Sequence, residues 1–324
     1  TVLSLDPRGA PNESGHVCLD LNGDGTYELH LEAAELPYLM PINDATPPVI
    51  HLATKTESRP LQLQVLDNGS AALAPLWRKN SVMEVLTSNI CEPCLGLDSF
   101  LHDLMATGEH ADGTPYAEGA FVLLKHHEHD SESYEVASER AAALRKTIGN
   151  PYSYVDGKAE IYGWTGEADV FTAAIQSSLS EEPQAALQGQ AWFGCPEQDN
   201  CVDVTLNVHL RDRLRDKLRL HIIVAENGIV PGYPNAFFET NDYVSVAGVT
   251  VDLAAVDADT LHVERQVLLQ RSEGDERDWQ ESHLHVVAFL EDLNDCSEAL
   301  ETRCKILNVT ALTLTGQPGQ GGKH

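Results

Sequence analysis

The stretch from Val82 to Met105, VMEVLTSNICEPCLGLDSFLHDLM, decides the fold of the middle of the chain. Its first six residues are typical of a buried strand. After the pair Cys91–Cys94, apolar residues recur at helical spacing: Leu95, Leu97, Phe100, Leu101, Leu104 and Met105. The pattern predicts a strand, a tight turn that carries CxxC, and a helix that begins at the two sulfurs.

This placement favours sulfur chemistry. The partial positive charge at a helix N-terminus stabilises a thiolate. We therefore expect Cys91 to be the exposed, attacking sulfur and Cys94 to be the resolving sulfur, one turn along the helix. A CxxC pair is also half of a zinc site, but no second CxxC exists to complete one. The sequence thus favours a redox pair over a zinc ligand pair.

From Val82 to about Ala174 the chain resembles the thioredoxin-like superfamily and, more narrowly, the Omp28-related group of secreted bacterial proteins. The likeness rests on the CxxC pair with Pro93 inside it and on four further segments: the strand end 84–88, the strand 120–124, the helix 138–148 and the stretch 149–157. Pro151 stands where that superfamily carries a cis proline facing the CxxC. The resemblance implies thiol–disulfide exchange with protein thiols or disulfides as partners. It also implies that Pro151 presents backbone to a substrate chain.

The rest of the chain is β-rich. Residues 1–78 contain alternating strands and turn signals, and residues 183–315 hold about seven strands separated by turns, a pattern typical of an antiparallel sandwich. We expect an α/β thioredoxin-like domain over 79–182 and an all-β antiparallel sandwich domain over 183–315. A β-rich N-terminal segment over 1–78 and a flexible Gly/Gln-rich tail over 316–324 complete the prediction.

The seven cysteines divide by spacing. Cys195 and Cys201 bracket one short polar loop, and Cys296 and Cys304 bracket another. Both pairs are predicted to be local disulfides in an oxidising compartment, with buried free thiols as the alternative. Cys18 is left over, and it is either a buried thiol or a partner for another chain.

The net charge of the chain limits which classes of molecule it could bind. The 21 basic and 50 acidic residues give a net charge of −29, which disfavours binding to nucleic acid and to anionic lipid. No apolar run approaches the roughly 18 residues of a membrane-spanning helix. The chain begins at Thr1 without a charged-then-apolar leader. We expect a secreted bacterial protein, extracellular or periplasmic, whose signal peptide has been removed.

One acidic loop suggests calcium. In the stretch from Asp20 to Glu28, oxygen ligands at alternate positions precede a glycine turn, with Asp20, Asn22, Asp24 and Glu28 as the candidate ligands. This arrangement suits Ca²⁺. The twelfth position of an EF-hand would be Leu31, so a full EF-hand is excluded. A plain acidic turn is the competing interpretation.

A histidine-rich run offers a second metal hypothesis. His126, His127 and His129 follow the predicted strand 120–124 within a few residues. Imidazoles with neighbouring carboxylates can bind Zn²⁺ or Cu²⁺ if the loop brings them together. Within an extended strand His127 and His129 share one face and His126 points away. A mixed copper site of the cysteine pair with His127 is a variant of this hypothesis, and a solvated loop is the alternative.

Three functions therefore remain open. The first is thiol–disulfide exchange through Cys91 and Cys94. The second is a non-catalytic extracellular protein, structural or self-assembling, in which the Cys91–Cys94 bond is permanent. The third is a copper or zinc binding protein that uses the histidine run.

Overall fold

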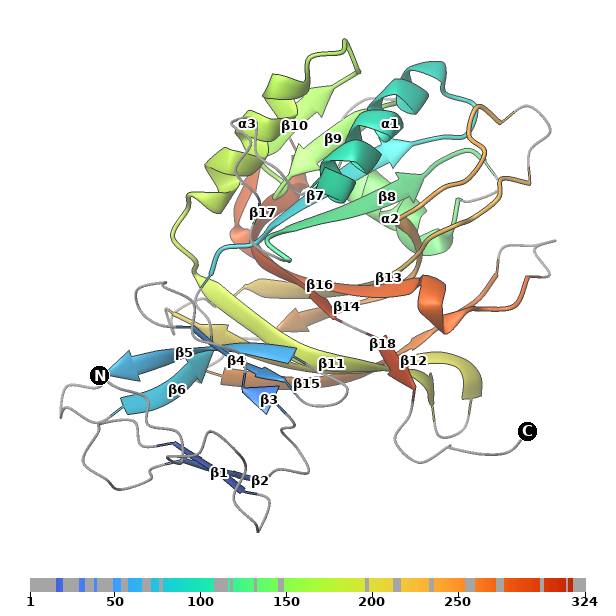
Figure 1. The fold of residues 1–324 in the computed structure, drawn as a ribbon. Coiled ribbons are helices and arrows are strands. Elements are labelled where there is room, and N and C mark those ends of the chain that lie inside the picture. The colour runs from blue at the N-terminus through green and yellow to red at the C-terminus, as the bar shows by residue number, and fades with distance from the viewer. Residues whose placement is uncertain are drawn as a thin grey trace. The chain divides into compact units, whose positions relative to one another are not determined.

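The computed structural model contains two compact units, Thr1–Trp77 and Arg78–His324 (Figure 1). The structure describes the backbone of residues 16–19, 29–32, 38–39, 49–53, 58–65 and 71–75 in the first unit. In the second it describes residues 78–107, 116, 119–130, 133–144, 149–195, 198–211, 217–232, 236–253, 260–271, 277–297, 300–312 and 314–316. The predicted flexible tail falls almost wholly outside these residues.

The described residues of the first unit form two antiparallel sheets. β1 (His16–Leu19) pairs with β2 (Leu29–Glu32). The other sheet is a meander of four strands in sequence order, β3 (Tyr38–Leu39), β4 (Val49–Ala53), β5 (Ser58–Val65) and β6 (Ala71–Pro75). Cys18 lies in β1 opposite His30. The predicted calcium ligands Asp20, Asn22, Asp24 and Glu28 lie outside the described residues.

One mixed sheet of eight strands organises the second unit. Its order is β10-β9-β7-β8-β14-β13-β16-β17. The bounds are β7 (Ser81–Thr87), β8 (Phe121–His127), β9 (Tyr152–Val155), β10 (Ala159–Tyr162), β13 (Leu218–Glu226), β14 (Val244–Leu253), β16 (Leu284–Ser297) and β17 (Leu300–Leu312). β8 is parallel to both of its neighbours, β7 and β14, and every other neighbouring pair is antiparallel.

This sheet overturns the predicted fold class. An α/β thioredoxin-like domain followed by a separate sandwich is wrong, because strands from both predicted domains belong to one sheet in a mostly β structure. The junction is the pairing of Lys125 in β8 with Val244 in β14, where the Lys125 amide donates to the Tyr243 carbonyl at 2.8 Å. The physical reason is burial of apolar surface, since Val122 and Leu124 of β8 share one core with Ile223 of β13 and with Val287 and Phe289 of β16.

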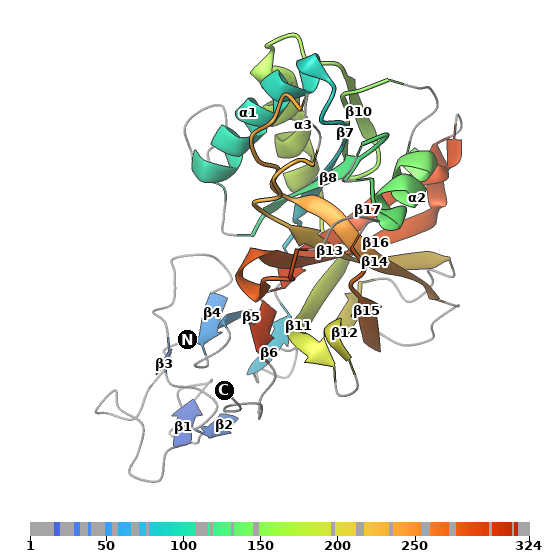
Figure 2. The same ribbon diagram turned by 90° about the vertical axis from the view of Figure 1, so that its right-hand side faces the viewer.

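The three helices cover opposite faces of this sheet (Figures 1 and 2). α1 (Glu92–Thr107) and α3 (Ala168–Leu179) pack on the face that carries Met83 and Val85. α2 (Glu135–Leu144) lies on the opposite face with Leu86. Because side chains alternate along a strand, β7 needs apolar residues on both faces, and all seven of its residues are buried.

A second sheet packs on the C-terminal part of the large one. Its order is β15 (Thr260–Leu268), β12 (Gln198–Leu210), β11 (Ala185–Cys195) and β18 (Leu314–Gly316). Alternate residues of β12, including Val204, Leu206 and Val208, form one core with Leu220 and Ile222 of β13. The four-stranded sheet is thus one layer of a sandwich. The other layer is formed by β13, β14 and β16, which are strands of the eight-stranded sheet. A short 3-10 helix, η1 (Glu281–His283), precedes β16.

The large sheet curls back on itself. The Asn80 amide, just before β7, donates to Oδ1 of Asn308 in β17 at 2.8 Å. The amide of Ile306, also in β17, donates to the carbonyl of Asp156 in the β9–β10 turn at 2.9 Å. The next residue of this turn, Gly157, has φ +69° and lies so close to β17 that a Cβ would overlap the Cys304 carbonyl oxygen. The concave side of the curl therefore encloses side chains from both halves of the sheet.

Candidate functional site

Cys91 and Cys94 form a disulfide at the start of α1, with their Cα atoms 5.2 Å apart. Cys91 immediately precedes the first helical residue, Glu92. Cys91 is partly exposed, whereas Cys94 is only 2% exposed. The strand–turn–helix predicted from the sequence is present, and it leaves one sulfur at the surface with the other behind it.

The Cys91 sulfur is one of two acceptors for an amide in the first turn of α1. The Cys94 amide donates to the Cys91 carbonyl at 3.1 Å and lies 3.2 Å from Cys91 Sγ, and the Cys91 amide donates to the Ser88 carbonyl at 3.1 Å. The first amides of a helix have no partner within the helix. A negative charge on Cys91 Sγ would thus face an amide that already points at it and the positive end of the helix dipole.

Pro151 adjoins this region. Its peptide bond with Asn150 is cis. Tyr152 pairs with Leu86 in β7, which puts Pro151 at the level of Thr87, four residues before Cys91. Pro151 is buried, and its carbonyl oxygen accepts from the Gly163 amide at 2.9 Å.

Trp164 links the β10 end to the first turn of α1. Atoms of the indole ring would lie 2.6 Å from a Cβ built on Gly96, so a larger residue at this position would force the ring or the helix to shift. The ring also stacks on Phe100 with centroids 5.1 Å apart. The indole therefore fixes the position of α1, and the sequence analysis did not identify it.

Asn89 anchors the turn before the cysteines, and it is fully buried. Its amide donates to Asp130 Oδ2 at 2.7 Å. Its carbonyl accepts from the Phe237 amide at 2.9 Å, and its Oδ1 accepts from Asn241 Nδ2 at 2.7 Å. Phe237 and Asn241 belong to the connection between β13 and β14, far along the chain. The predicted redox turn is thus built in part by a segment outside the resemblance region.

The histidine run does not converge. His126 and His127 are both buried at the end of β8. His126 Nε2 lies 3.1 Å from Glu84 Oε1, whereas His127 Nδ1 lies 3.0 Å from Asp130 Oδ2. His129 is exposed and has φ 60°. Among the described residues, no three His, Cys, Asp or Glu side chains gather at a spacing that could hold a metal ion. Copper or zinc binding by the run stays a prediction.

A buried ionic network links the two halves of the sheet. Arg140 of α2 donates to both carboxylate oxygens of Glu84 in β7, at 2.6 and 2.8 Å, and to Glu291 of β16 at 2.9 Å. His221 of β13 reaches the other oxygen of Glu291 at 3.0 Å. Glu84 has one further partner, since His126 Nε2 lies 3.1 Å from Glu84 Oε1. The sequence analysis missed this network, although a charged residue within an apolar strand such as 82–87 was a usable signal.

The network fixes the protonation of its members. Burial by itself would raise the pKa of Glu84, but the Arg140 charge and its hydrogen bonds hold that pKa well below the usual range. The pKa of Glu291 is lowered in the same way, since burial is outweighed by Arg140 and His221. Burial lowers the pKa of His221. Glu84 is therefore a permanent anion near pH 7 and is unsuited to taking protons from the cysteines.

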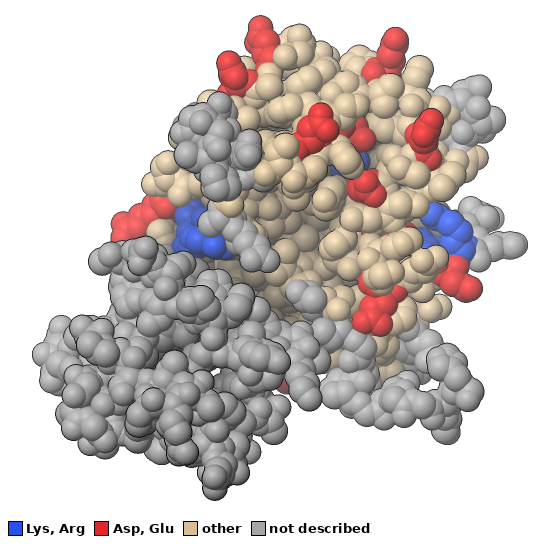
Figure 3. All heavy atoms as spheres, viewed as in Figure 1, with Lys and Arg blue, Asp and Glu red and all other residues tan. Residues whose placement is uncertain are grey.

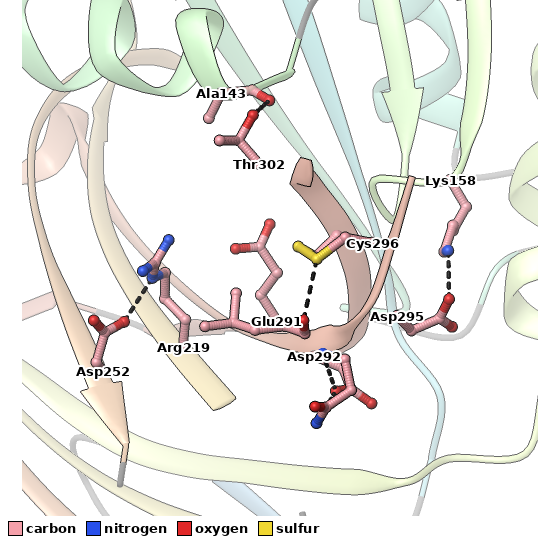
Figure 4. The surroundings of a disulfide bond; sticks show 12 residues. Ala143, Lys158, Arg219, Asp252, Glu291, Asp292, Asp295, Cys296 and Thr302 are labelled. Carbon is pink, nitrogen blue, oxygen red and sulfur yellow. Dashed lines mark hydrogen bonds and ion pairs between the residues drawn. A yellow bond between two sulfur atoms is a disulfide. The ribbon is translucent and has the colours of Figure 1, made fainter. Parts of the chain in front are cut away.

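The other two cysteine pairs lie at disulfide distance, as their spacing predicts. Cys195–Cys201 joins β11 to β12, and Cys296–Cys304 joins β16 to β17. Figure 4 shows Cys296 beside Asp295, which pairs with Lys158 at 2.5 Å. Cys195, Cys201 and Cys304 are all buried. Of the described disulfides, Cys91–Cys94 is the one whose attackable sulfur belongs to a helix cap.

The surface of this unit is acidic on the side shown in Figure 3, where Asp and Glu side chains are scattered over the helices and strands. This view agrees with the net charge of −29. No helix in the described parts of the chain is both long and apolar enough to cross a membrane.

The fold and the site thus define a mostly β protein with a helix-capping CxxC disulfide. No protein-family model matches the chain, and no curated protein matches it. The resemblance to Omp28-related proteins is therefore not confirmed by a family match.

Solved structures give a partial likeness. HBP35 of Porphyromonas gingivalis is 15% identical with a TM-score of 0.59, over 76% of this chain and 79% of that chain. Protein AGR_C_4864 from Agrobacterium tumefaciens is 13% identical with a TM-score of 0.41, over 75% of this chain and 97% of that one. The first likeness supports a related fold and nothing further, and the second is too distant to carry an argument.

Proposed function

We propose that the protein carries out thiol–disulfide exchange through Cys91 and Cys94. The observation that carries the proposal is the helix cap: the partly exposed Cys91 sulfur accepts from the Cys94 amide at 3.2 Å, with Cys94 buried behind it. This is the environment in which a thiolate is stabilised and reactive. Three disulfides in the described chain favour an oxidising compartment, secreted or periplasmic.

The exchange balances without a cofactor. In the reduced protein the Cys91 thiolate attacks one sulfur of a substrate disulfide, forming a mixed disulfide and releasing a substrate thiolate, which takes up a proton. The Cys94 thiolate then attacks Cys91 Sγ, breaks the mixed disulfide and releases the second substrate thiolate. Two electrons pass from the protein to the substrate, and the Cys91–Cys94 disulfide forms. The reverse sequence oxidises a substrate dithiol.

Pro151 has a supporting role in this proposal. Its carbonyl oxygen is already bonded to Gly163, so a substrate backbone would have to bind at the preceding residue, Asn150. Because Arg140 stabilises the Glu84 carboxylate as an anion, Glu84 does not take part in the proton transfers. Protons would then come from solvent at the exposed Cys91.

Selective reduction tests the proposal. Under increasing dithiol concentration at pH 7, the Cys91–Cys94 bond should open well before Cys195–Cys201 and Cys296–Cys304, as followed by alkylation and peptide mapping. The wild type should reduce insulin, Cys91→Ser should not, and Cys296→Ser should keep the activity as the matched control. Equal rates for the wild type and Cys91→Ser would end the enzymatic interpretation.

The non-catalytic alternative predicts the opposite. A structural Cys91–Cys94 bond would stay closed under mild reductant, and size-exclusion chromatography would show a defined polymer. Opening of this bond first, in a monomer, favours exchange.

A further inference from the structure

Three exposed apolar residues lie close to Cys91 in the sequence or through a backbone hydrogen bond to its turn. Ile90 is 49% exposed, Leu95 is 38% exposed and Phe237 is 46% exposed. Exposed apolar residues are ordinary when they are scattered singly, but a group of them beside a reactive position marks a binding surface.

Local helix geometry accounts for two of these three residues. Ile90 precedes the capping Cys91, and Leu95 is the fourth residue of α1, so the two occupy the positions of a hydrophobic staple. A staple explains why both are apolar. It does not explain Phe237, which comes from the connection between β13 and β14.

The fold holds Phe237 next to the cysteines. Its amide donates to the carbonyl of Asn89 at 2.9 Å, one residue before Ile90. Asn241 fastens the same connection through its bond to the Asn89 side chain and through its backbone pairing with Ile229. In both ribbon views the described part of this connection runs beside α1 (Figures 1 and 2). The backbone at Phe237 is therefore held by hydrogen bonds, while the Phe237 side chain stays 46% exposed.

We propose that Phe237 is a specificity-determining residue of the Cys91 site: it contacts an apolar side chain adjacent to the reacting cysteine of a polypeptide substrate. The inference rests on the proposed function. We infer a polypeptide substrate that contains a cysteine, because the surface includes the partly exposed Cys91 sulfur, which reacts with another sulfur. A small hydrophilic disulfide gains nothing from three apolar side chains, whereas a peptide covers them while its sulfur reaches Cys91.

Trapping on Cys91 tests the inference without turnover. In the full-length Cys94→Ala variant, the Cys91 thiol is offered two peptides whose cysteine is activated as a 2-pyridyl disulfide. One peptide has leucine and phenylalanine beside the cysteine, and the other has glycine and serine. Released pyridinethione gives the rates, and peptide mapping assigns the label to Cys91. The apolar peptide should react about tenfold faster, the factor expected when the exposed half of a phenyl ring is covered.

Two further variants in this background decide the role of Phe237. Phe237→Ser should reduce the rate ratio to about twofold or less. Leu268→Ser should leave the ratio unchanged, since Leu268 is 49% exposed on β15 in the other sheet.

A ratio near one in the Cys94→Ala protein, or an unchanged ratio in Phe237→Ser, overturns the inference. Equal slowing of both peptides overturns it too, because the Phe237 ring would then act only by keeping the β13–β14 connection in place. Labelling that falls as protein concentration rises would assign the surface to a second copy of the chain. Failure of the proposed function is a separate result: the wild type would not reduce insulin, while the trapping ratio could still be measured.

Discussion

Replacing Arg140 with methionine tests whether buried charges join the two halves of the eight-stranded sheet. The Arg140 side chain is 4% exposed, Glu84 is 0% exposed and Glu291 is 1% exposed. Methionine has similar length but neither charge nor donors, so Arg140→Met leaves two buried carboxylates without their cation. Breaking a buried ion pair in this way costs about 3–5 kcal/mol. We expect a loss of that size in the free energy of unfolding at pH 7.

The loss should depend on pH with a definite sign. In the wild type the pKa values of Glu84 and Glu291 are lowered. Their stabilising contribution is therefore present above the unfolded-state pKa of about 4.3, and it is lost as the pH falls through the folded-state values. In Arg140→Met the contacts with His126 and His221 remain, but burial is no longer outweighed by Arg140. Both pKa values therefore rise, and a penalty appears as the pH rises above about 4.3. The difference between the two proteins should shrink as the pH falls from 7 to about 4.

Urea unfolding followed by tryptophan fluorescence at both pH values measures this difference. The matched control is Lys158→Met, which removes a surface ion pair whose side chains are 39% and 51% exposed (Figure 4). That pair should contribute less than about 1 kcal/mol at either pH. A loss below about 1 kcal/mol in Arg140→Met, or one that is equal at pH 4 and pH 7, would refute the reasoning.

Three further outcomes are expected. Gly157→Ala should cost about 2–4 kcal/mol in urea unfolding, because Gly157 has positive φ and a Cβ there overlaps a carbonyl of β17. Gly163→Ala, with positive φ but open space around it, should cost about 1–2 kcal/mol, and equal costs would contradict the packing argument. Asp156→Asn should cost about 3–5 kcal/mol by the same assay, because it leaves the buried Lys79 ammonium without its carboxylate, and a neutral result would contradict this. Calcium titration should give heat with the wild type and none with Asp24→Ala, and equal heats would dismiss the predicted loop.

Local features of the site were predictable. A mostly apolar stretch of six residues, then CxxC, then apolar residues at helical spacing specify a strand, a turn and a helix, since each depends on neighbours in sequence. The short spacing of Cys195–Cys201 and of Cys296–Cys304 likewise limits their partners. Cys91 at a helix cap follows from the same local pattern.

The fold class was predicted wrongly for a non-local reason. The apolar run of β8 and the apolar alternation of β14 indicate two strands, but they do not say that Lys125 pairs with Val244. Strand partners far apart in sequence are chosen by packing of the whole chain, so two apparent domains became one sheet. The sequence could also not reveal that Asn89 is held by Phe237 and Asn241.

The sequence by itself therefore determined the strand before Cys91, the helix after it, the place of Cys91 at the start of that helix, and the strongly acidic composition of the chain. These properties depend on side-chain periodicity and composition, which are local or additive. The tertiary structure alone decided which strands pair, which charges meet Arg140, and which distant loop borders Cys91. Those contacts arise only when segments 56 to 152 residues apart are brought together to satisfy buried backbone groups and buried charges.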